Sequence, residues 1–214
     1  LPGQVAWRAL VPAPRVPSPE ARVTMGPGRH VVSYPLRGGE VMNIVAVREE
    51  AGWTEEGWMH EGDPDALRAA FADFGGPARA LLDRVERVNV WGLFRHPVAA
   101  RWHGTASALL GDAAHPTLPF LAQGANLALE DAWVLADCLG AHDTGEALAL
   151  YQARRRPRVV RAIEAANANA RNYHLKNPIL RTGAHAALRL GGRLAPAAPL
   201  RRFDWLYGHD VTRE

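Results

Sequence analysis

Residues 107–137 join an apolar stretch, a glycine turn and a long apolar helix, and this succession most constrains the fold. The apolar stretch at residues 107–110 predicts a short strand that breaks at Gly111. After a loop with two prolines, a helix is expected to begin near Gln123. Such a succession places the acidic side chain of Asp112 and a helix N-terminus together at the strand's carboxyl end. Ligands with hydroxyl, phosphate or anionic oxygen groups tend to bind there.

The expected helix offers hydrogen-bond donors at its start and carries acidic side chains along its length. The N–H groups of Gly124, Ala125 and Asn126 have no intrahelical partner and lie at the positive end of the helix dipole. Most of the later positions are apolar, so we expect the helix to be largely buried. Glu130 and Asp131 then need partners, for which the arginines of the next helix are the candidates, in a structural role.

The residues of this stretch also carry a family resemblance. The string Gly111-Asp112-Ala113-Ala114-His115-Pro116, followed by Pro119, Gln123-Gly124-Ala125-Asn126 and Glu130-Asp131, closely resembles the second flavin-binding motif of the single-component FAD-dependent aromatic hydroxylases. That family includes 4-hydroxybenzoate, salicylate and 3-hydroxybenzoate hydroxylases. The tail at residues 203–211 looks like the C-terminal signature of the salicylate and 3-hydroxybenzoate branch.

The resemblance implies a fold and a reaction. The fold is α+β or α/β, part of the 4-hydroxybenzoate hydroxylase-like FAD-binding fold, with an antiparallel substrate-side sheet, a flavin-binding strand-loop-helix and C-terminal helices. The reaction is hydroxylation of a phenolic or other aromatic acid. In it NAD(P)H reduces FAD, and O2 then forms the flavin C4a-hydroperoxide, which delivers one oxygen atom to the ring.

The resemblance also assigns roles to residues of the motif. Gly111, Asp112, Gly124, Ala125 and Asn126 correspond to residues that bind FAD, and the amides of the last two resemble those that meet the N1–C2=O edge of the flavin.

Two further positions of the motif match residues near the flavin. Pro119 matches a proline whose carbonyl lies by the reactive flavin edge and the substrate hydroxyl. Some 3-hydroxybenzoate 6-hydroxylases carry glutamine at this position, which argues against that exact activity. The residues alone also allow His115 to act as a catalytic base, but its counterpart in the resembling family is structural or flavin-adjacent.

The N-terminal part reads as an antiparallel meander. Turn residues separate apolar-alternating segments at residues 4–11, 22–25, 30–34 and 41–47, and a proline-rich loop runs from Pro12 to Pro19. On the third segment His30, Val32 and Tyr34 share one face. From the residues alone, His30 and Tyr34 can equally be half-exposed cross-strand side chains without a role in binding. The resemblance implies that His30 and Tyr34 grip the phenol, with the histidine taking a proton near neutral pH.

Helix signals and the resemblance divide the chain into three segments. Trp53 and Trp58 bracket an acidic loop, and Asp63 then looks like the N-cap of a helix with proline at its first position. Pro157 predicts a kink or break in a helix that starts near Thr144. The segments are the substrate-binding sheet with flanking helices at 1–103, the flavin motif at 104–140 and a C-terminal helical segment at 141–214. Further helices are expected at 63–74, 77–85 and 178–190, the last ended by Gly191 and Gly192.

Composition excludes several classes of protein. No apolar run approaches the ~18 residues of a membrane span, and the start of the chain does not read as a signal peptide. Cys138, the only cysteine, is expected to be a packing residue in a reducing cytoplasm. The net charge of +3 comes from arginine, clustered at residues 154–158, which we interpret as a solvated helix face with ion pairs. Neither a nucleic-acid fingerprint nor HExxH or other metal-ligand spacing is present, so no metal is expected.

Several alternatives stay open at this point. No strand–GxGxxG–helix opens the sequence, so it resembles the C-terminal part of a hydroxylase. Without that half the chain is either a catalytically incomplete fragment or a non-enzymatic module; alternatively, the enzyme acts on a larger aromatic natural product. The expected partners are a small aromatic substrate and O2, but no nucleic acid and no membrane. A homodimer and an association with an N-terminal FAD-binding half are both compatible with the sequence.

Overall fold

The computed structural model describes residues 3–13, 19–50, 52, 57, 60–195 and 197–213. Most of the proline-rich loop and the loop with Trp53 and Trp58 therefore lie outside the described residues. The chain divides into two compact units. The first comprises Leu1–Phe94 with Asn172–Pro178, and the second comprises Arg95–Arg171 with Ile179–Glu214.

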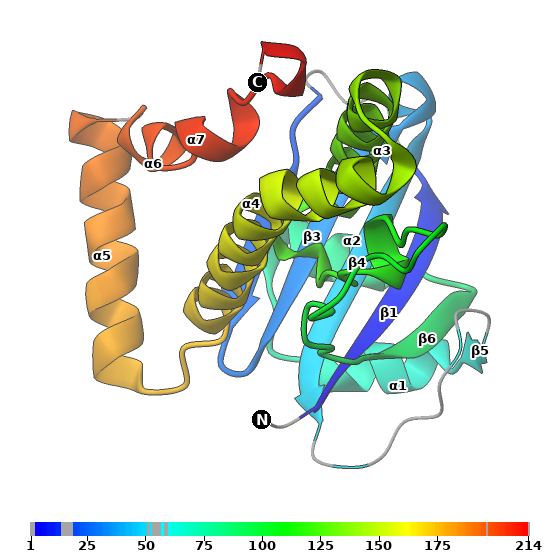
Figure 1. Ribbon diagram of the computed structural model, residues 1–214. Helices are drawn as coiled ribbons and strands as arrows, with labels where there is room; N and C mark the ends of the chain where they lie inside the picture. Colours follow the sequence, from blue (N-terminus) through cyan, green and yellow to red (C-terminus); the bar gives the residue numbers. More distant parts are fainter. Residues whose placement is uncertain are drawn as a thin grey trace. The chain divides into compact units, whose positions relative to one another are not determined.

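The first unit is built on a six-stranded antiparallel sheet with the order β2-β3-β4-β1-β6-β5 (Figure 1). The meander expected from the alternating segments is confirmed for β2, β3 and β4, whereas β1 inserts between β4 and β6. The strands are β1 (Gly3–Pro12), β2 (Arg22–Gly26), β3 (Arg29–Leu36), β4 (Val41–Glu50), β5 (His60–Gly62) and β6 (Val88–Leu93).

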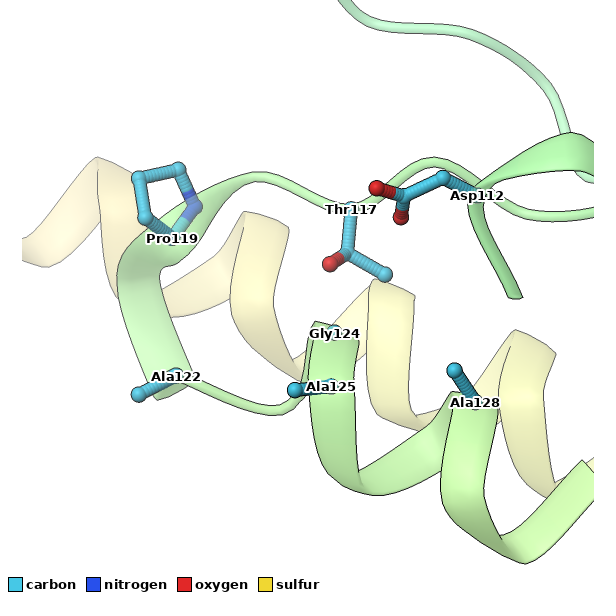
Figure 2. Close-up of a pocket in the computed structure, with 7 residues that line it drawn as sticks. All are labelled: Asp112, Thr117, Pro119, Ala122, Gly124, Ala125 and Ala128. Carbon is cyan, nitrogen blue, oxygen red and sulfur yellow. The ribbon is translucent and has the colours of Figure 1, made fainter.

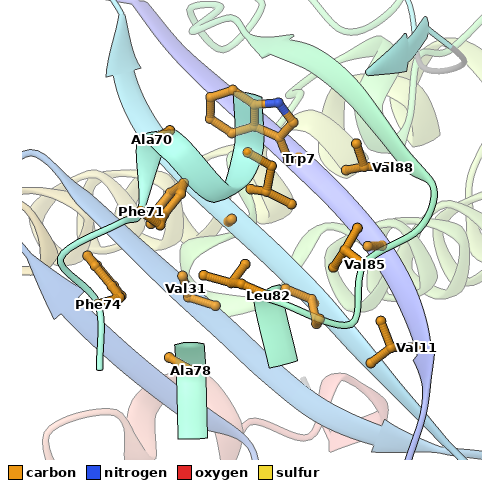
Figure 3. Close-up of a cluster of buried hydrophobic side chains, with 14 of the residues drawn as sticks. Trp7, Val11, Val31, Ala70, Phe71, Phe74, Ala78, Leu82, Val85 and Val88 are labelled. Carbon is orange, nitrogen blue, oxygen red and sulfur yellow. The ribbon is translucent and has the colours of Figure 1, made fainter. Parts of the chain in front are cut away.

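Two short helices, α1 (Pro64–Ala70) and α2 (Gly76–Leu82), cover one face of this sheet and close its core (Figure 3). The ring of Trp7 on β1 meets Phe71 edge-on, with ring centroids 6.1 Å apart. Burying each such side chain stabilises the fold by about 1.5–3 kcal/mol. The N-cap prediction is confirmed, because Asp63 accepts a hydrogen bond from the N–H of Asp65 at 2.8 Å.

The second unit is mainly helical. In it α3 (Gly124–Ala141) and α4 (Thr144–Tyr173) are joined by only two residues. The unit also contains α5 (Pro178–Leu194), α6 (Ala198–Arg201) and α7 (Asp204–Tyr207), with 3-10 turns at Gly111–Ala113, Pro119–Leu121 and Val211–Arg213. Together the two units confirm the mixed α/β class with an antiparallel sheet and C-terminal helices.

Two helices continue through residues that were expected to interrupt them. Pro157 does not break α4, whose buried stripe continues on both sides of it through Tyr151, Arg155 and Val159. Packing of that stripe outweighs the ~3 kcal/mol that an interior proline costs. Helix α5 likewise continues through Gly191 and Gly192, neither of which adopts the positive φ of a helix-ending glycine.

The strand predicted at residues 107–110 is wrong. A strand needs a neighbouring backbone, and the only pairing that the described residues make here is a single bridge between His103 and Ala108. The chain folds back on itself instead, with the N–H of Leu109 donating to the carbonyl of Trp102 at 2.7 Å. The carbonyl of Leu109 accepts from the hydroxyl of Tyr151. This extended segment leads into the glycine turn without belonging to a sheet.

Helix α3 is also less buried than its apolar sequence predicted. Its buried side chains lie on one stripe, Leu127, Asp131, Val134 and Cys138, which confirms Cys138 as a packing residue. Leu129 and Trp133 are 70% and 52% exposed. No helix in the described part of the chain is long and apolar enough to cross a membrane.

Candidate functional site

The glycine turn and the start of α3 enclose a pocket of about 430 Å³ in the second unit (Figure 2). It brings together Asp112, Pro119, Gly124 and Ala125, four of the residues that the sequence singled out. Thr117, Ala122 and Ala128 complete its lining. The pocket therefore joins an acidic side chain, a helix N-terminus and a proline turn, as the order of the residues predicted.

Two glycines allow the loop to lie directly on the helix. Gly111 has a φ of +56°, and a Cβ at this position would lie 3.0 Å from the Cβ of Ala128. A Cβ at Gly124 would lie 2.9 Å from the Oγ1 of Thr117. Any side chain at position 124 would therefore enter the space between the loop and the helix.

The N-terminus of α3 provides donors at this pocket. The N-cap residue Gln123 makes no side-chain capping hydrogen bond. The N–H groups of Gly124, Ala125 and Asn126 precede the first intrahelical donor, the N–H of Leu127, which bonds to the carbonyl of Gln123 at 2.9 Å. These donors and the positive end of the helix dipole suit a carbonyl or anionic oxygen, while Asp112 suits a hydroxyl donor.

Asn126 lines a different pocket. That second pocket, of about 460 Å³, lies between the other side of α3 and the C-terminal tail. Glu130 and Trp133 on α3 and Tyr207 on the tail line it with Asn126. Asn126 is not among the residues that line the first pocket and belongs to the donor set at the helix start through its backbone N–H.

A buried ion network fixes the glycine turn to α3 and α4. Asp131 is fully buried, and its Oδ2 accepts from the N–H of Gly111 at 3.0 Å and from the Nε2 of His115 at 2.5 Å. Its Oδ1 accepts from the Nε of Arg155 at 2.8 Å. Burial alone raises the pKa of Asp131, but these three hydrogen bonds outweigh it and hold the pKa below its ordinary value. His115 is buried and bonded to Asp131, which suits the structural role that the resemblance allowed.

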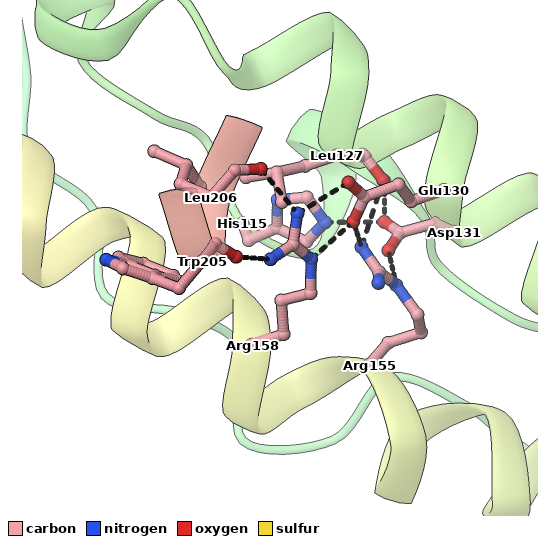
Figure 4. A network of polar contacts seen from close by, with 9 residues as sticks. His115, Leu127, Glu130, Asp131, Arg155, Arg158, Trp205 and Leu206 are labelled. Carbon is pink, nitrogen blue, oxygen red and sulfur yellow. Dashed lines mark hydrogen bonds and ion pairs between the residues drawn. The ribbon is translucent and has the colours of Figure 1, made fainter. Parts of the chain in front are cut away.

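Glu130 extends the network to the C-terminal tail (Figure 4). Its carboxylate pairs with Arg155 and Arg158, each at 2.7 Å. Arg158 also donates to the carbonyls of Trp205 and Leu206 at 3.1 and 3.2 Å. The prediction that arginines of the next helix hold Glu130 and Asp131 is confirmed. The prediction of a solvated arginine face is wrong for Arg155, whose side chain is fully buried.

His30 and Tyr34 lie in the first unit, on the sheet face opposite to α1 and α2. Alternation along β3 is confirmed, since Val31 packs in the helix-covered core. Tyr34, partly buried, stands opposite Asn43 of β4. The half-exposed alternative is wrong for His30, which is 2% exposed, with its Nδ1 2.7 Å from the Nε2 of His174.

Burial is the largest cause that lowers the pKa of His30 to about 3, and repulsion between its ring and that of His174 when both are protonated is the second. The expectation of proton uptake near neutral pH therefore does not hold. At neutral pH His30 is uncharged, and a neutral imidazole offers one donor and one acceptor nitrogen.

Sequence reasoning missed further polar residues on this sheet face. The Nε of Arg8 donates to the Oδ1 of Asn43 at 3.0 Å, and alternation along β1 and β4 could have indicated that pair. His174 follows α4, and no local sequence signal connects it with His30. Among the described residues, no group of three or more His, Cys, Asp or Glu side chains is arranged to hold a metal ion.

Comparisons with known proteins show which proteins the chain is similar to. The chain is 37% identical to 3-amino-4-hydroxybenzoate 2-monooxygenase PtnB3 from Streptomyces platensis, over 98% of this chain and 53% of that protein. It is also 37% identical to 3-hydroxybenzoate 6-hydroxylase 2 from Aquipseudomonas alcaligenes, over 80% of this chain and 55% of that protein. The chain thus spans about half the length of these relatives.

Solved structures show the same fold. A salicylate hydroxylase substrate complex matches 99% of this chain and 55% of its own, with a TM-score of 0.80 and 22% identity. Klebsiella pneumoniae HpxO, complexed with FAD and uric acid, matches 90% of this chain and 50% of its own, with a TM-score of 0.74 and 27% identity. A family model described as "FAD binding domain" matches residues 20–166, the range that contains the pocket lining and the charged side chains of the ion network. The chain therefore belongs to the FAD binding domain family.

Proposed function

We propose that this chain supplies the substrate-side and flavin-side residues of an FAD-dependent monooxygenase that hydroxylates a phenolic aromatic acid. The observation that carries the proposal is the pocket in which Asp112 and the N-terminus of α3 converge around Gly124. Relatives named as hydroxybenzoate and salicylate hydroxylases support the substrate class. A buried, unpaired Cys138 supports a place in the reducing cytoplasm as part of the same proposal.

The residues of the pocket fit FAD. The carboxylate of Asp112 would accept hydrogen bonds from hydroxyls of the cofactor's ribityl chain, and the N–H groups of Ala125 and Asn126 would donate to a carbonyl edge of its ring. Gly124 leaves the space that this approach requires. When bound, FAD supplies the oxygen-activating chemistry, with NAD(P)H as reductant and O2 as co-substrate.

The remaining residues bind and orient the substrate. Pro119 lies on the same pocket as Gly124, where its turn would border the cofactor and the ring hydroxyl. His30 and Tyr34 would bind the phenol from the sheet, with neutral His30 as a hydrogen-bond partner. A hydrogen bond accepted from the phenol raises the electron density of the ring, which favours attack by an electrophilic oxygen.

Absorbance spectroscopy of the purified protein tests this proposal. We expect added FAD to show perturbed flavin bands, and added salicylate or 3-hydroxybenzoate to perturb them again, because the proposed reaction brings the ring of the acid to the flavin. Benzoate, which has no ring hydroxyl, is the matched control and should have a weaker effect. A spectrum of free FAD would overturn the proposal in favour of a binding or assembly module. Bound flavin that ignores all these acids would overturn the substrate class and favour a larger aromatic compound.

A further inference from the structure

A row of polar side chains leads from the edge of the first unit to His30. The Oε1 of Glu49 lies 3.1 Å from the Nδ1 of His174, and the Nε2 of His174 lies 2.7 Å from the Nδ1 of His30. Both histidines are buried, with 5% and 2% of their surface exposed. Two adjacent buried imidazoles destabilise the fold unless each donor nitrogen faces an acceptor. The hydrogen bonds along this row must therefore run in one direction.

The carboxylate sets that direction. Partial burial on its own raises the pKa of Glu49, but hydrogen bonds from Lys176 and His174 outweigh it and leave the pKa below its ordinary value. Glu49 is therefore ionised at neutral pH and can only accept. The Nδ1 of His174 therefore carries a proton. The ring of His174 is only 5% exposed, and Lys176 already pairs with the carboxylate beside it, which disfavours a second proton on the ring. With His174 neutral, its Nε2 accepts from Nδ1 of His30. The proton of His30 thus resides on Nδ1, which makes its Nε2 the acceptor nitrogen.

The other groups around the two rings agree with this assignment. Lys176 pairs with the second oxygen of Glu49 at 2.5 Å and so favours the ionised carboxylate. The side-chain amide of Gln4 lies 3.3 Å from the Nδ1 of His174. Rotating that amide by half a turn presents its oxygen to the same N–H. The ring of Tyr173 packs against His30 with centroids 5.2 Å apart and limits rotation of the imidazole.

We propose that Glu49 and His174 are positioning residues that hold His30 in the Nδ1–H tautomer, so that its Nε2 accepts a hydrogen bond from the substrate hydroxyl. The substrate part of this inference rests on the proposed function, whereas the tautomer part does not. If both neutral rings took the opposite tautomer, the Nδ1 of His174 would turn a lone pair toward the anionic carboxylate of Glu49. One charged residue on β4 thereby determines whether the sheet offers the phenol an acceptor or a donor.

Nitrogen-15 NMR of histidine-labelled full chain tests the tautomer directly. We expect His30 and His174 both to be neutral with the proton on Nδ1 at pH 7. In Glu49→Gln the amide can donate as well as accept, so His30 should shift toward the Nε2–H form. Glu50→Gln, which removes the neighbouring carboxylate paired with Arg48, is the control and should leave both tautomers unchanged. A wild-type His30 protonated on Nε2, or unaltered in Glu49→Gln, would overturn the proposal.

A second readout separates the two parts of the inference. Loss of the acceptor in Glu49→Gln should weaken binding of 3-hydroxybenzoate to the FAD-loaded protein by about tenfold, the effect of one hydrogen bond. Binding of benzoate, which has no hydroxyl to donate, should change little. His174→Gln, which retains a polar side chain, gives an independent variant if Glu49→Gln fails to fold. If the tautomers are as expected but no aromatic acid binds, the proposed function is contradicted, while the assignment of Glu49 and His174 as positioning residues stands. If Glu49→Gln changes the tautomer but the phenolic acid binds as tightly as before, the substrate part of the inference is overturned.

Discussion

Arg155→Met is expected to lower the free energy of unfolding by about 3–5 kcal/mol, the cost of leaving a buried charge without its partner. Arg155 is fully buried and bonds to both Asp131 and Glu130. Methionine fills much of the same space but offers no donor. Asp131 would keep its hydrogen bonds from His115 and Gly111, yet lose its only arginine contact among the described residues.

The neighbouring arginine provides the control for this experiment. Arg154 pairs with Asp137 at 2.7 Å, but the carboxylate is 56% exposed. Exposed ion pairs contribute about 0–1 kcal/mol, so Arg154→Met should unfold nearly as wild type does. Urea unfolding followed by circular dichroism measures both variants. Equal stability of the two variants would show that Asp131 does not depend on the buried arginine.

The same network makes a prediction about pH. The pKa of Asp131 is lowered on folding, so its interactions stabilise the protein above the unfolded pKa, and this stability is lost as pH falls through the folded pKa. In Arg155→Met the carboxyl protonates more readily, because its cationic partner is gone. The stability difference between wild type and variant should therefore shrink as the solution is acidified. Asp131→Asn in the Arg155→Met background should recover part of the loss at neutral pH.

Local sequence signals predicted the parts of the fold that depend on local physics. Apolar residues alternate along β1 to β4 because helices cover one face of the sheet. Asp63 caps its helix through a hydrogen bond from the N–H two residues later. The start of α3 and the arginine partners of Glu130 also followed from spacing and charge. Each of these features depends on neighbours in sequence or on simple charge pairing.

The features that sequence did not predict depend on distant contacts. Ser107–Leu110 has strand composition, but a strand requires a second backbone, which its sequence cannot supply. Pro157 normally breaks a helix, but the stripe on either side of it is buried. His174 and His30 meet across 144 residues, so no window of sequence connects them. The motif that lines the pocket could be recognised from the sequence because its residues lie within one short stretch. The residues that hold the His30 ring in place come from three separate elements.

Gly124→Val is expected to weaken FAD binding by at least about 100-fold, equivalent to roughly 2.7 kcal/mol. The first carbon of the new side chain would lie 2.9 Å from the Oγ1 of Thr117 and 4.0 Å from the Oδ1 of Asp112. Thr117 can rotate to relieve the contact, so the fold should tolerate the change. The two methyl groups would still occupy the space between the carboxylate and the helix donors, where the cofactor is proposed to bind.

A second glycine of α3 separates this effect from a change in the helix itself. A side chain at Gly140 would meet no atom within 4 Å, so Gly140→Ala should stabilise the helix by about 0.5–1 kcal/mol and leave FAD affinity unchanged. Fluorescence titration with FAD measures the affinities, and thermal unfolding confirms that both variants fold. If Gly124→Val fails to fold, Gly124→Ala introduces the same first carbon with less bulk. A folded Gly124 variant that binds FAD as wild type does would mean that the cofactor does not use the space above this helix N-terminus, and the pocket would need another ligand.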